Sequence, residues 1–308
     1  MTPATVPPNL ASRLVNGILA IEPLARLAKH RARQMMIKRA ESIGVFWLQE
    51  VAKLKERDWS ADLATVQNPA LQYPEYYVRS FHAYAEGNLG WEPALEVEVA
   101  AHAVHARIFP DAGAKGDALL RQSYHDILKS ALPTEPQDIL DLGCSVGMST
   151  FALQTAYPKA KITGVDLSPY FLAVANHKAS KQLTTHTSPT WLHAAAESTG
   201  LPDRSFDLVS AFLIFHELPQ SAAVAVLQEA RRLLRPGGHL ALMDMNPRSQ
   251  IYAKMPPYIL TLLKSTEPYL DEYFALDLEQ AFMAAGFDRP TITCNTPRHR
   301  TVIAKLQE

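Results

Sequence analysis

Two glycines and an acid stand close together in the segment Asp-Leu-Gly-Cys-Ser-Val-Gly, residues 141–147. Apolar residues precede the segment and a helix-like pattern follows it, so it is expected to form the turn between a strand and a helix. Gly143 and Gly147 lack a Cβ atom, which lets the backbone turn tightly and approach a ligand closely. Glycines also serve turn geometry alone, so this pair indicates a ligand site only together with other features.

A further acid, Asp166, ends the next apolar segment, 23 residues beyond Gly143. A carboxylate at the tip of a second strand can accept hydrogen bonds from the two hydroxyl groups of a ribose. Asp166 could instead help to cap the helix that begins after Ser168. Together, the glycine turn and this acid predict a nucleoside-binding site.

Four segments, in order, resemble the class I S-adenosylmethionine-dependent methyltransferase family. Residues 141–147 resemble its first motif, Val165-Asp166 its acidic second motif, residues 206–209 its fourth strand, and residues 233–238 the turn before its fifth strand. The similarity covers about residues 124–306. More loosely, the whole chain resembles uncharacterised methyltransferase-like proteins of cyanobacteria and plastids.

The resemblance implies S-adenosyl-L-methionine as the cofactor, with S-adenosyl-L-homocysteine as its product. It implies that the glycine turn and Asp141 hold the methionine end, that Asp166 holds the ribose, and that Glu197 approaches the adenine. Ser145 departs from the middle glycine that many members have, and alanines stand before Glu197 where an adenine-contacting aspartate is common. The expected cofactor-binding residues are Asp141, Gly143, Cys144, Ser145, Gly147, Asp166, Leu167, Glu197 and Phe212.

His216 follows the expected fourth strand, next to the place where the methyl group should lie. Methyl transfer from a sulfonium needs in-line placement of the acceptor, exclusion of water and sometimes a base. His216 could therefore be catalytic, by deprotonating a hydroxyl group or orienting an acceptor, or it could cap the following helix. Phe212-Leu-Ile-Phe215 occupies the place of the Asn-Pro-Pro-Tyr sequence used on nucleobase amino groups. With a formal net charge of −1, this argues against nucleic acid as a partner.

The acceptor is expected to be a small molecule bound by segments outside the glycine turn. Residues 73–91 are rich in aromatic side chains and predict an ordered loop, which could floor an acceptor pocket or pack the cap onto the sheet. Residues 264–273 could form a lid or an inter-domain contact, and residues 297–300 lie near the acceptor side in the family. The expected substrate-binding residues are His82, Tyr84, Trp91, Tyr269 and His299.

Short apolar strands alternate with helices from residue 139 onward, which predicts a parallel sheet covered on both faces. We expect an α/β fold with a Rossmann-like, seven-stranded, doubly wound sheet and an antiparallel last strand. Residues 1–132 are expected to form a helical N-terminal cap and substrate region, residues 133–308 the methyltransferase domain, and residues 246–274 a lid insertion. Strands are expected at residues 138–142, 161–165, 191–194, 206–212, 239–245, 291–294 and 301–304.

The composition is that of an ordinary globular protein, with 308 residues of which 47% are hydrophobic and 20% charged. Cys144 and Cys294 have no metal-ligand spacing, so neither a metal site nor a disulfide framework is expected, and a cytoplasmic setting is predicted. Seven cations face the single acid Glu22 in residues 1–40. That segment could touch an anionic membrane peripherally or meet a partner, or it could form a cap helix packed on its own protein.

These features predict S-adenosylmethionine-dependent methyl transfer to oxygen or carbon of a small aromatic or apolar acceptor. A prenylated quinone-like acceptor at a membrane is a variant that the basic N-terminal segment suggests. The alternative is a non-catalytic S-adenosylmethionine-binding sensor or scaffold protein, because no base is assured.

Overall fold

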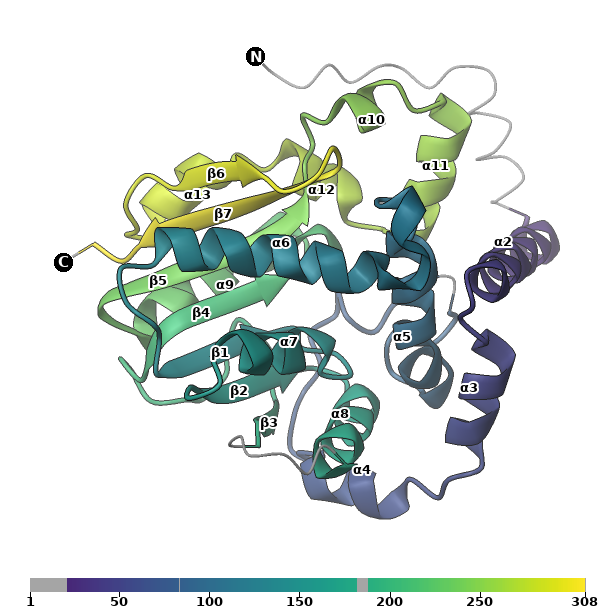
Figure 1. Ribbon diagram of the computed structural model, residues 1–308, viewed down its shortest axis with the longest axis horizontal. Helices are drawn as coiled ribbons and strands as arrows, with labels where there is room; N and C mark the ends of the chain where they lie inside the picture. The colour runs from purple at the N-terminus through teal and green to yellow at the C-terminus, as the bar shows by residue number, and fades with distance from the viewer. Residues whose placement is uncertain (1–20, 83, 182–187, 308) are drawn as a thin grey trace.

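The computed structural model describes residues 21–82, 84–181 and 188–307. A seven-stranded sheet of order β3-β2-β1-β4-β5-β7-β6 lies at the centre (Figure 1). Strand β7 pairs antiparallel with β5 and with β6, whereas the other neighbouring strands are parallel. The predicted doubly wound sheet is confirmed. Its strands are β1 (Asp138–Leu142), β2 (Lys161–Asp166), β3 (Thr190–His193), β4 (Phe206–Phe212), β5 (Leu234–Met245), β6 (Thr291–Cys294) and β7 (His299–Lys305).

Both faces of the sheet are covered by helices with apolar sides. In Figure 1 the helices α6 (Gly116–Ala131) and α7 (Met148–Ala156) lie in front of the sheet, while α9 (Gln220–Leu233) and α13 (Leu278–Ala284) lie behind it. Each pair contributes fully buried leucines to a separate apolar core on its side of the strands. Helix α8 (Pro169–Lys181) follows β2 and packs against β3 and α4 (Ser60–Val66).

The cap contains the helices α2 (Glu22–Ser42), α3 (Trp47–Lys55), α4 and α5 (Trp91–His105), followed by the short η1 (Pro110–Lys115). Residues 34–55 are divided between α2 and α3. Gly44 has a φ of 81° and separates α2 from α3, because this left-handed conformation does not continue a helix. Residues 73–91 form turns with one bridge between Phe81 and Tyr84.

Helix α6 packs on the sheet rather than within the cap. Tyr124 is buried, and its hydroxyl group lies 2.9 Å from Ser210 Oγ of β4 and donates to the Ala241 carbonyl of β5 at 3.2 Å. The predicted boundary between residues 132 and 133 would separate α6 from the sheet face that it covers. We therefore propose a boundary before α6, near Lys115.

The segment predicted as a lid contains α10 (Gln250–Ala253), α11 (Pro257–Thr266) and the start of α12 (Leu270–Ala275). No described helix is long and apolar enough to cross a membrane. Ile37 and Ala40 of α2 are buried in the cap, which supports the cap-helix interpretation for this end of the basic segment. Residues 1–20, which carry the rest of that prediction, lie outside the described residues.

Candidate active site

A cavity of about 900 Å³ lies at the carboxyl ends of the parallel strands. The ends of β1, β2, β4 and β5 and the turns after them form one side of it. The cap, the loop of residues 76–88 and lid helix α11 form the other side. The two parts of the chain therefore enclose one site, in the position expected for ligands of an open α/β sheet.

The turn after β1 reaches the cavity through Gly143, Cys144 and Ser145. The backbone N–H groups of Gly143 and Cys144 donate to the Val165 carbonyl at 2.8 and 3.0 Å. Gly143 has a φ of 67°, and a Cβ atom there would lie 2.4 Å from Cδ1 of Ile214. Ser145 also has a positive φ, 50°, which is uncommon for a residue with a side chain. All three lie where the cofactor prediction requires them, and their contact with it remains a prediction.

Asp166 ends β2 and lines the cavity. Its Oδ2 accepts a hydrogen bond from Ser145 N and its Oδ1 from Ser168 N, both at 2.8 Å. It thus holds the turn before α8 and also faces the cavity. Burial raises the pKa of Asp166 to about 6, although the two backbone donors act in the opposite direction. The Tyr77 side chain also hydrogen-bonds to this carboxylate, and one lone pair is left to accept from a ligand hydroxyl group.

Asp141 and Gly147 are not among the residues that line the cavity. Asp141 is fully buried, and its Oδ2 accepts hydrogen bonds from Ser149 Oγ and Thr150 Oγ1 at 2.7 and 2.6 Å. These bonds attach the first turn of α7 to the end of β1. Gly147 is the N-cap of α7, with a φ of 82°. The structure therefore places Asp141 behind the glycine turn, with Oδ2 bonded to α7 and Oδ1 buried without a hydrogen-bond partner among the described residues.

Glu197, predicted to approach the adenine, also lies off the cavity wall. Its Oε1 accepts a hydrogen bond from the Tyr76 hydroxyl group at 2.7 Å, which directs the carboxylate toward the loop of residues 73–91. The predicted Leu167 does line the cavity, with Ala194 and Ala196 beside it in the wall. These apolar side chains offer a flat base a better surface than a carboxylate does.

Phe212 ends β4 and lines the cavity, as does Arg121 of α6. The Arg121 guanidinium lies 4.5 Å over the Phe212 ring and donates to Asp117 Oδ2 at 2.9 Å. Asp117 Oδ1 lies 2.6 Å from Nδ1 of His105. This buried network holds the Phe212 ring between α6 and the sheet.

His216 lies in the short helix η2 (Phe215–Glu217) after β4 and lines the cavity. Its Nδ1 lies 2.7 Å from Oδ1 of Asp244, a buried residue near the end of β5, and its backbone N–H donates to Oδ2 of the same carboxylate at 3.1 Å. Asp244 therefore orients the ring and leaves Nε2 available. Burial alone would lower the pKa of His216, but the Asp244 carboxylate raises it to about 10. The His216 side chain therefore contacts Asp244 and does not cap the following helix.

His82 brings two further carboxylates to His216. Its Nε2 lies 3.1 Å from Oε1 of Glu267 and 3.4 Å from Oε1 of Glu217. Burial would lower the pKa of His82, but Glu267 and Glu217 raise it to about 9. Burial raises the pKa of Glu217 to about 7 against the effect of the two histidines. All four residues line the cavity, so its acceptor side is densely charged.

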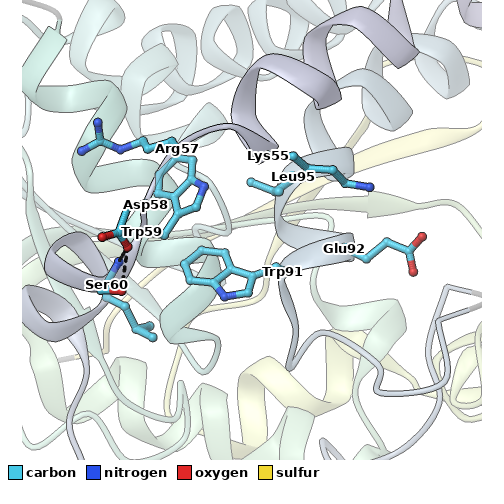
Figure 2. Close-up of a pocket in the computed structure, with 9 residues that line it drawn as sticks. Lys55, Arg57, Asp58, Trp59, Ser60, Trp91, Glu92 and Leu95 are labelled. Carbon is cyan, nitrogen blue, oxygen red and sulfur yellow. Dashed lines mark hydrogen bonds between the residues drawn. The ribbon is translucent and has the colours of Figure 1, made fainter.

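The remaining predicted acceptor residues divide into two groups. Tyr84 and His299 line the cavity. Trp91 faces a separate outer pocket of about 380 Å³, where its ring lies 5.6 Å from that of Trp59 (Figure 2). Tyr269 packs edge-on against Tyr76 and also lies off the cavity wall. Trp91 and Tyr269 were therefore placed wrongly, because aromatic content does not distinguish a packed ring from a ligand contact.

Arginines line another part of the cavity wall. Arg107 and Arg298 line it, and neither has a carboxylate partner among the described residues. Arg39 lies near both of them, since burial and then these two cations lower the pKa of Arg39. This end of the cavity therefore favours an anionic group.

Sequence reasoning missed Asp244, Glu267 and Arg107, whereas Arg298 belongs to the segment 297–300 that was expected near the acceptor side. Asp244 could have been found, because it ends an apolar strand as Asp166 does, and parallel strands end at one edge of the sheet. Glu267 has no such local signal, since it lies between α11 and α12.

Comparison with known proteins places the central part of the chain in a family. Residues 139–238 match the methyltransferase domain. A malonyl-[acyl-carrier protein] O-methyltransferase of Hahella chejuensis is 36% identical over 34% of this chain and 35% of its own length. An uncharacterized methyltransferase of Synechocystis is 29% identical over 54% of this chain and 74% of its own.

A solved structure, the CurJ carbon methyltransferase, shares the fold with a TM-score of 0.54 at 15% identity, over 84% of this chain and 70% of that one. The fold and the matched segment define a Rossmann-like transferase domain. It is a class I S-adenosylmethionine-dependent methyltransferase domain, and the cofactor of this class is S-adenosylmethionine. The site suits that cofactor, because the Gly143 turn presents no Cβ atom and Asp166 faces the cavity with an unused lone pair.

Proposed function

We propose that the protein transfers a methyl group from S-adenosylmethionine to a small acceptor enclosed in the cavity. The observation that carries this proposal is that Asp166 and the glycine turn line the same cavity as His216, the ring that Asp244 orients. S-adenosylmethionine supplies a methyl group on a positively charged sulfur. The chain's residues bind it, exclude water and hold the acceptor in line.

The cavity walls indicate an acceptor with an apolar body. Apolar walls come from the loop, the lid and the strand ends, including Phe81, Met245, Ile259 and Leu262. The similar proteins include an O-methyltransferase and a carbon methyltransferase, so transfer to both kinds of atom is represented among them. We propose an aromatic or otherwise apolar acceptor whose reacting end is an oxygen or an adjacent carbon.

The two cavity arginines indicate that the acceptor also carries an anionic group. Arg107 and Arg298 are cations without carboxylate partners among the described residues, so an acid or phosphate on the acceptor would compensate them. Replacing either by alanine should raise the KM for acidic acceptors more than for their methyl esters. Equal effects on acids and esters would argue against this part of the proposal.

His216 is the residue proposed to contact the reacting end of the acceptor. Asp244 fixes its ring through Nδ1, so a hydrogen-bonding atom stands at a defined place in the cavity. Because Asp244 sets the orientation of the His216 ring, we propose that methyl transfer depends on this contact. The Asp244→Asn variant should therefore lower kcat while leaving the affinity for S-adenosylhomocysteine unchanged.

The test combines calorimetric titration with S-adenosylhomocysteine and a radiolabelled methyl-transfer screen over phenols, enolisable acids and quinols. We expect cofactor binding in the wild type and a roughly 100-fold or greater loss of transfer in His216→Gln. His239→Gln is the matched control, because His239 begins the ladder of β5 at the opposite edge of the sheet. Absence of cofactor binding would exclude the enzyme proposal.

Tight cofactor binding with no transfer to any acceptor would favour the sensor or scaffold alternative. Membrane contact through residues 1–40 also remains a proposal, tested by sedimentation with anionic vesicles. A deletion for that test should stop before α2, because Arg33 of this helix donates to the fully buried Glu96 at 3.0 Å. Cytoplasmic location stays a proposal from the two unpaired cysteines.

A further inference from the structure

The acceptor side of the cavity contains an unusual cluster of metal-ligand types. One ligand atom from each of His82, His216 and Glu217 lies within 4.8 Å of the others. Glu267 adds a second carboxylate, 3.1 Å from His82 Nε2. Ligands that share one ion at 2.0–2.2 Å are separated by roughly 3 to 4 Å, so these spacings need only small side-chain movements to close on an ion. No metal site was predicted from the spacing of the two cysteines, and the residues of this cluster come from three distant segments.

Glu267 supplies independent evidence. Its side chain is only 9% exposed, and its Oε2 is a buried oxygen that accepts no hydrogen bond. A buried carboxylate oxygen without a partner is costly, and in a native protein it calls for an ion or a bound molecule. Glu267 lines the cavity, and its other oxygen, Oε1, lies 3.1 Å from His82 Nε2, so the orphan Oε2 belongs to a carboxylate in contact with the cluster.

The backbone conformation at His82 also indicates a ligand site at this cluster. His82 has a φ of 47°, a conformation uncommon for a residue with a side chain. Its N–H donates to the Thr266 carbonyl at 3.1 Å, which joins this loop to the end of lid helix α11. Strained backbone of this kind persists where the surroundings hold it, and it gathers at ligand sites.

Asp244 completes an arrangement known to favour metal binding by imidazole. It holds Nδ1 of His216 at 2.7 Å, so the other ring nitrogen is the one offered to the cavity. A carboxylate behind a histidine orients the ring and makes it a better ligand.

We propose that His82, His216 and Glu217, with Glu267 beside them, bind one divalent transition-metal ion of the Zn²⁺ or Fe²⁺ type. Two imidazoles and a carboxylate select such ions over Mg²⁺ or Ca²⁺ and leave coordination positions open. If the proposed function holds, the open positions face the acceptor, so the ion binds an acceptor oxygen and lowers its pKa. This assigns acceptors with an ionisable hydroxyl or enol group to the site.

Metal binding is tested without cofactor or acceptor. The full chain is treated with chelator, dialysed and titrated with Zn²⁺ by calorimetry and with Co²⁺ by visible absorption. We expect one ion per chain and Co²⁺ bands that report nitrogen and oxygen ligands. His82→Ala and Glu217→Gln should each weaken binding at least about tenfold. His30→Ala is the matched control, because His30 lines the same cavity outside the cluster and should not change binding.

Two further measurements distinguish loss of the metal site from misfolding of a variant and from failure of the proposed function. S-adenosylhomocysteine affinity checks that each variant is folded, and zinc-edge X-ray absorption of the wild type counts imidazole ligands directly. Two imidazoles support the proposal even if a variant fails to fold. No binding, or a bound ion without imidazole ligands, overturns it. Metal binding without cofactor binding would contradict the proposed function and would still support the metal site.

Discussion

At the scale of single residues, acids at the carboxyl ends of parallel strands do most to define the site. Asp166 ends β2 and faces the cavity, and Asp244, near the end of β5, orients His216. Asp141, at the same edge, is instead used to anchor α7. An acid's strand position therefore predicts that it lies near the site, while its hydrogen-bond partners decide what it does there.

Replacing Asp166 by asparagine should weaken S-adenosylhomocysteine binding by roughly 10- to 100-fold, since a hydrogen bond to a charged group contributes about 1.5–3 kcal/mol. The change keeps the size of the side chain and one acceptor oxygen. Asp138→Asn is the control, because Asp138 begins β1 at the opposite edge and pairs with Arg235 on the surface. Equal calorimetric affinities for the two variants would show that Asp166 does not contact the ligand.

At the scale of elements, the turn after β1 depends on a close approach between two loops. Gly143→Ala should destabilise the protein by about 2–4 kcal/mol, because its φ is 67° and the added Cβ would lie 2.4 Å from Ile214. Gly200→Ala is the matched control, with a φ of 70° and no neighbour within 4 Å. Urea denaturation of both variants checks this, and a loss no larger in Gly143→Ala would refute the close approach.

A buried acid of α5 joins this helix to α2 and to the loop that contains Tyr84. Glu96 is fully buried and accepts hydrogen bonds from Arg33 of α2 and from the Tyr84 hydroxyl group, the latter at 2.8 Å. Glu96→Gln should therefore cost about 3 kcal/mol and loosen α2, since it removes the buried carboxylate that pairs with the partly buried Arg33. Glu92→Gln removes an exposed carboxylate 3.8 Å from the same arginine, so it should cost under about 1 kcal/mol. Thermal unfolding and hydrogen exchange in α2 would measure both, and similar losses would contradict the account.

At the scale of the whole molecule, buried neutral histidines make stability depend on pH. Burial, then Arg121 and Lys129, lowers the pKa of His125 to about 4. The unfolded chain, with an ordinary value near 6.5, takes up this proton first as the pH falls. The contribution is therefore fully present above pH 6.5 and is lost between pH 6.5 and about 4.

Between pH 7 and pH 4.5 His125 makes the free energy of unfolding fall, while the raised pKa values of Asp166 and Glu217 act in the opposite direction. His125→Gln should remove the part of the fall that comes from this histidine, up to about 3 kcal/mol. His30→Gln, at an exposed position of α2, should leave the fall unchanged. Urea denaturation at the two pH values measures both. An unchanged fall in His125→Gln would show that this histidine is not held neutral in the folded state.

The sequence by itself determined the sheet and the glycine turn, while the class of cofactor was implied by the resemblance of four segments to the methyltransferase family. Strand periodicity, turn residues and the spacing of Gly143 to Asp166 are local patterns, and local backbone chemistry suffices to interpret them. The break between α2 and α3 needed the structure as well, because Gly44 separates the two helices there. A single left-handed glycine outweighs the surrounding periodicity.

Only the tertiary structure decided the acceptor side of the site. His82, His216 and Glu267 are far apart in the chain, and they meet because the loop, η2 and the lid close on the same strand ends. The structure also removed Trp91 and Tyr269 from the cavity and placed Glu197 against Tyr76. Whether a polar or aromatic side chain faces a ligand or a neighbouring side chain depends on how distant segments pack together. The spacing of residues along the chain does not determine that packing.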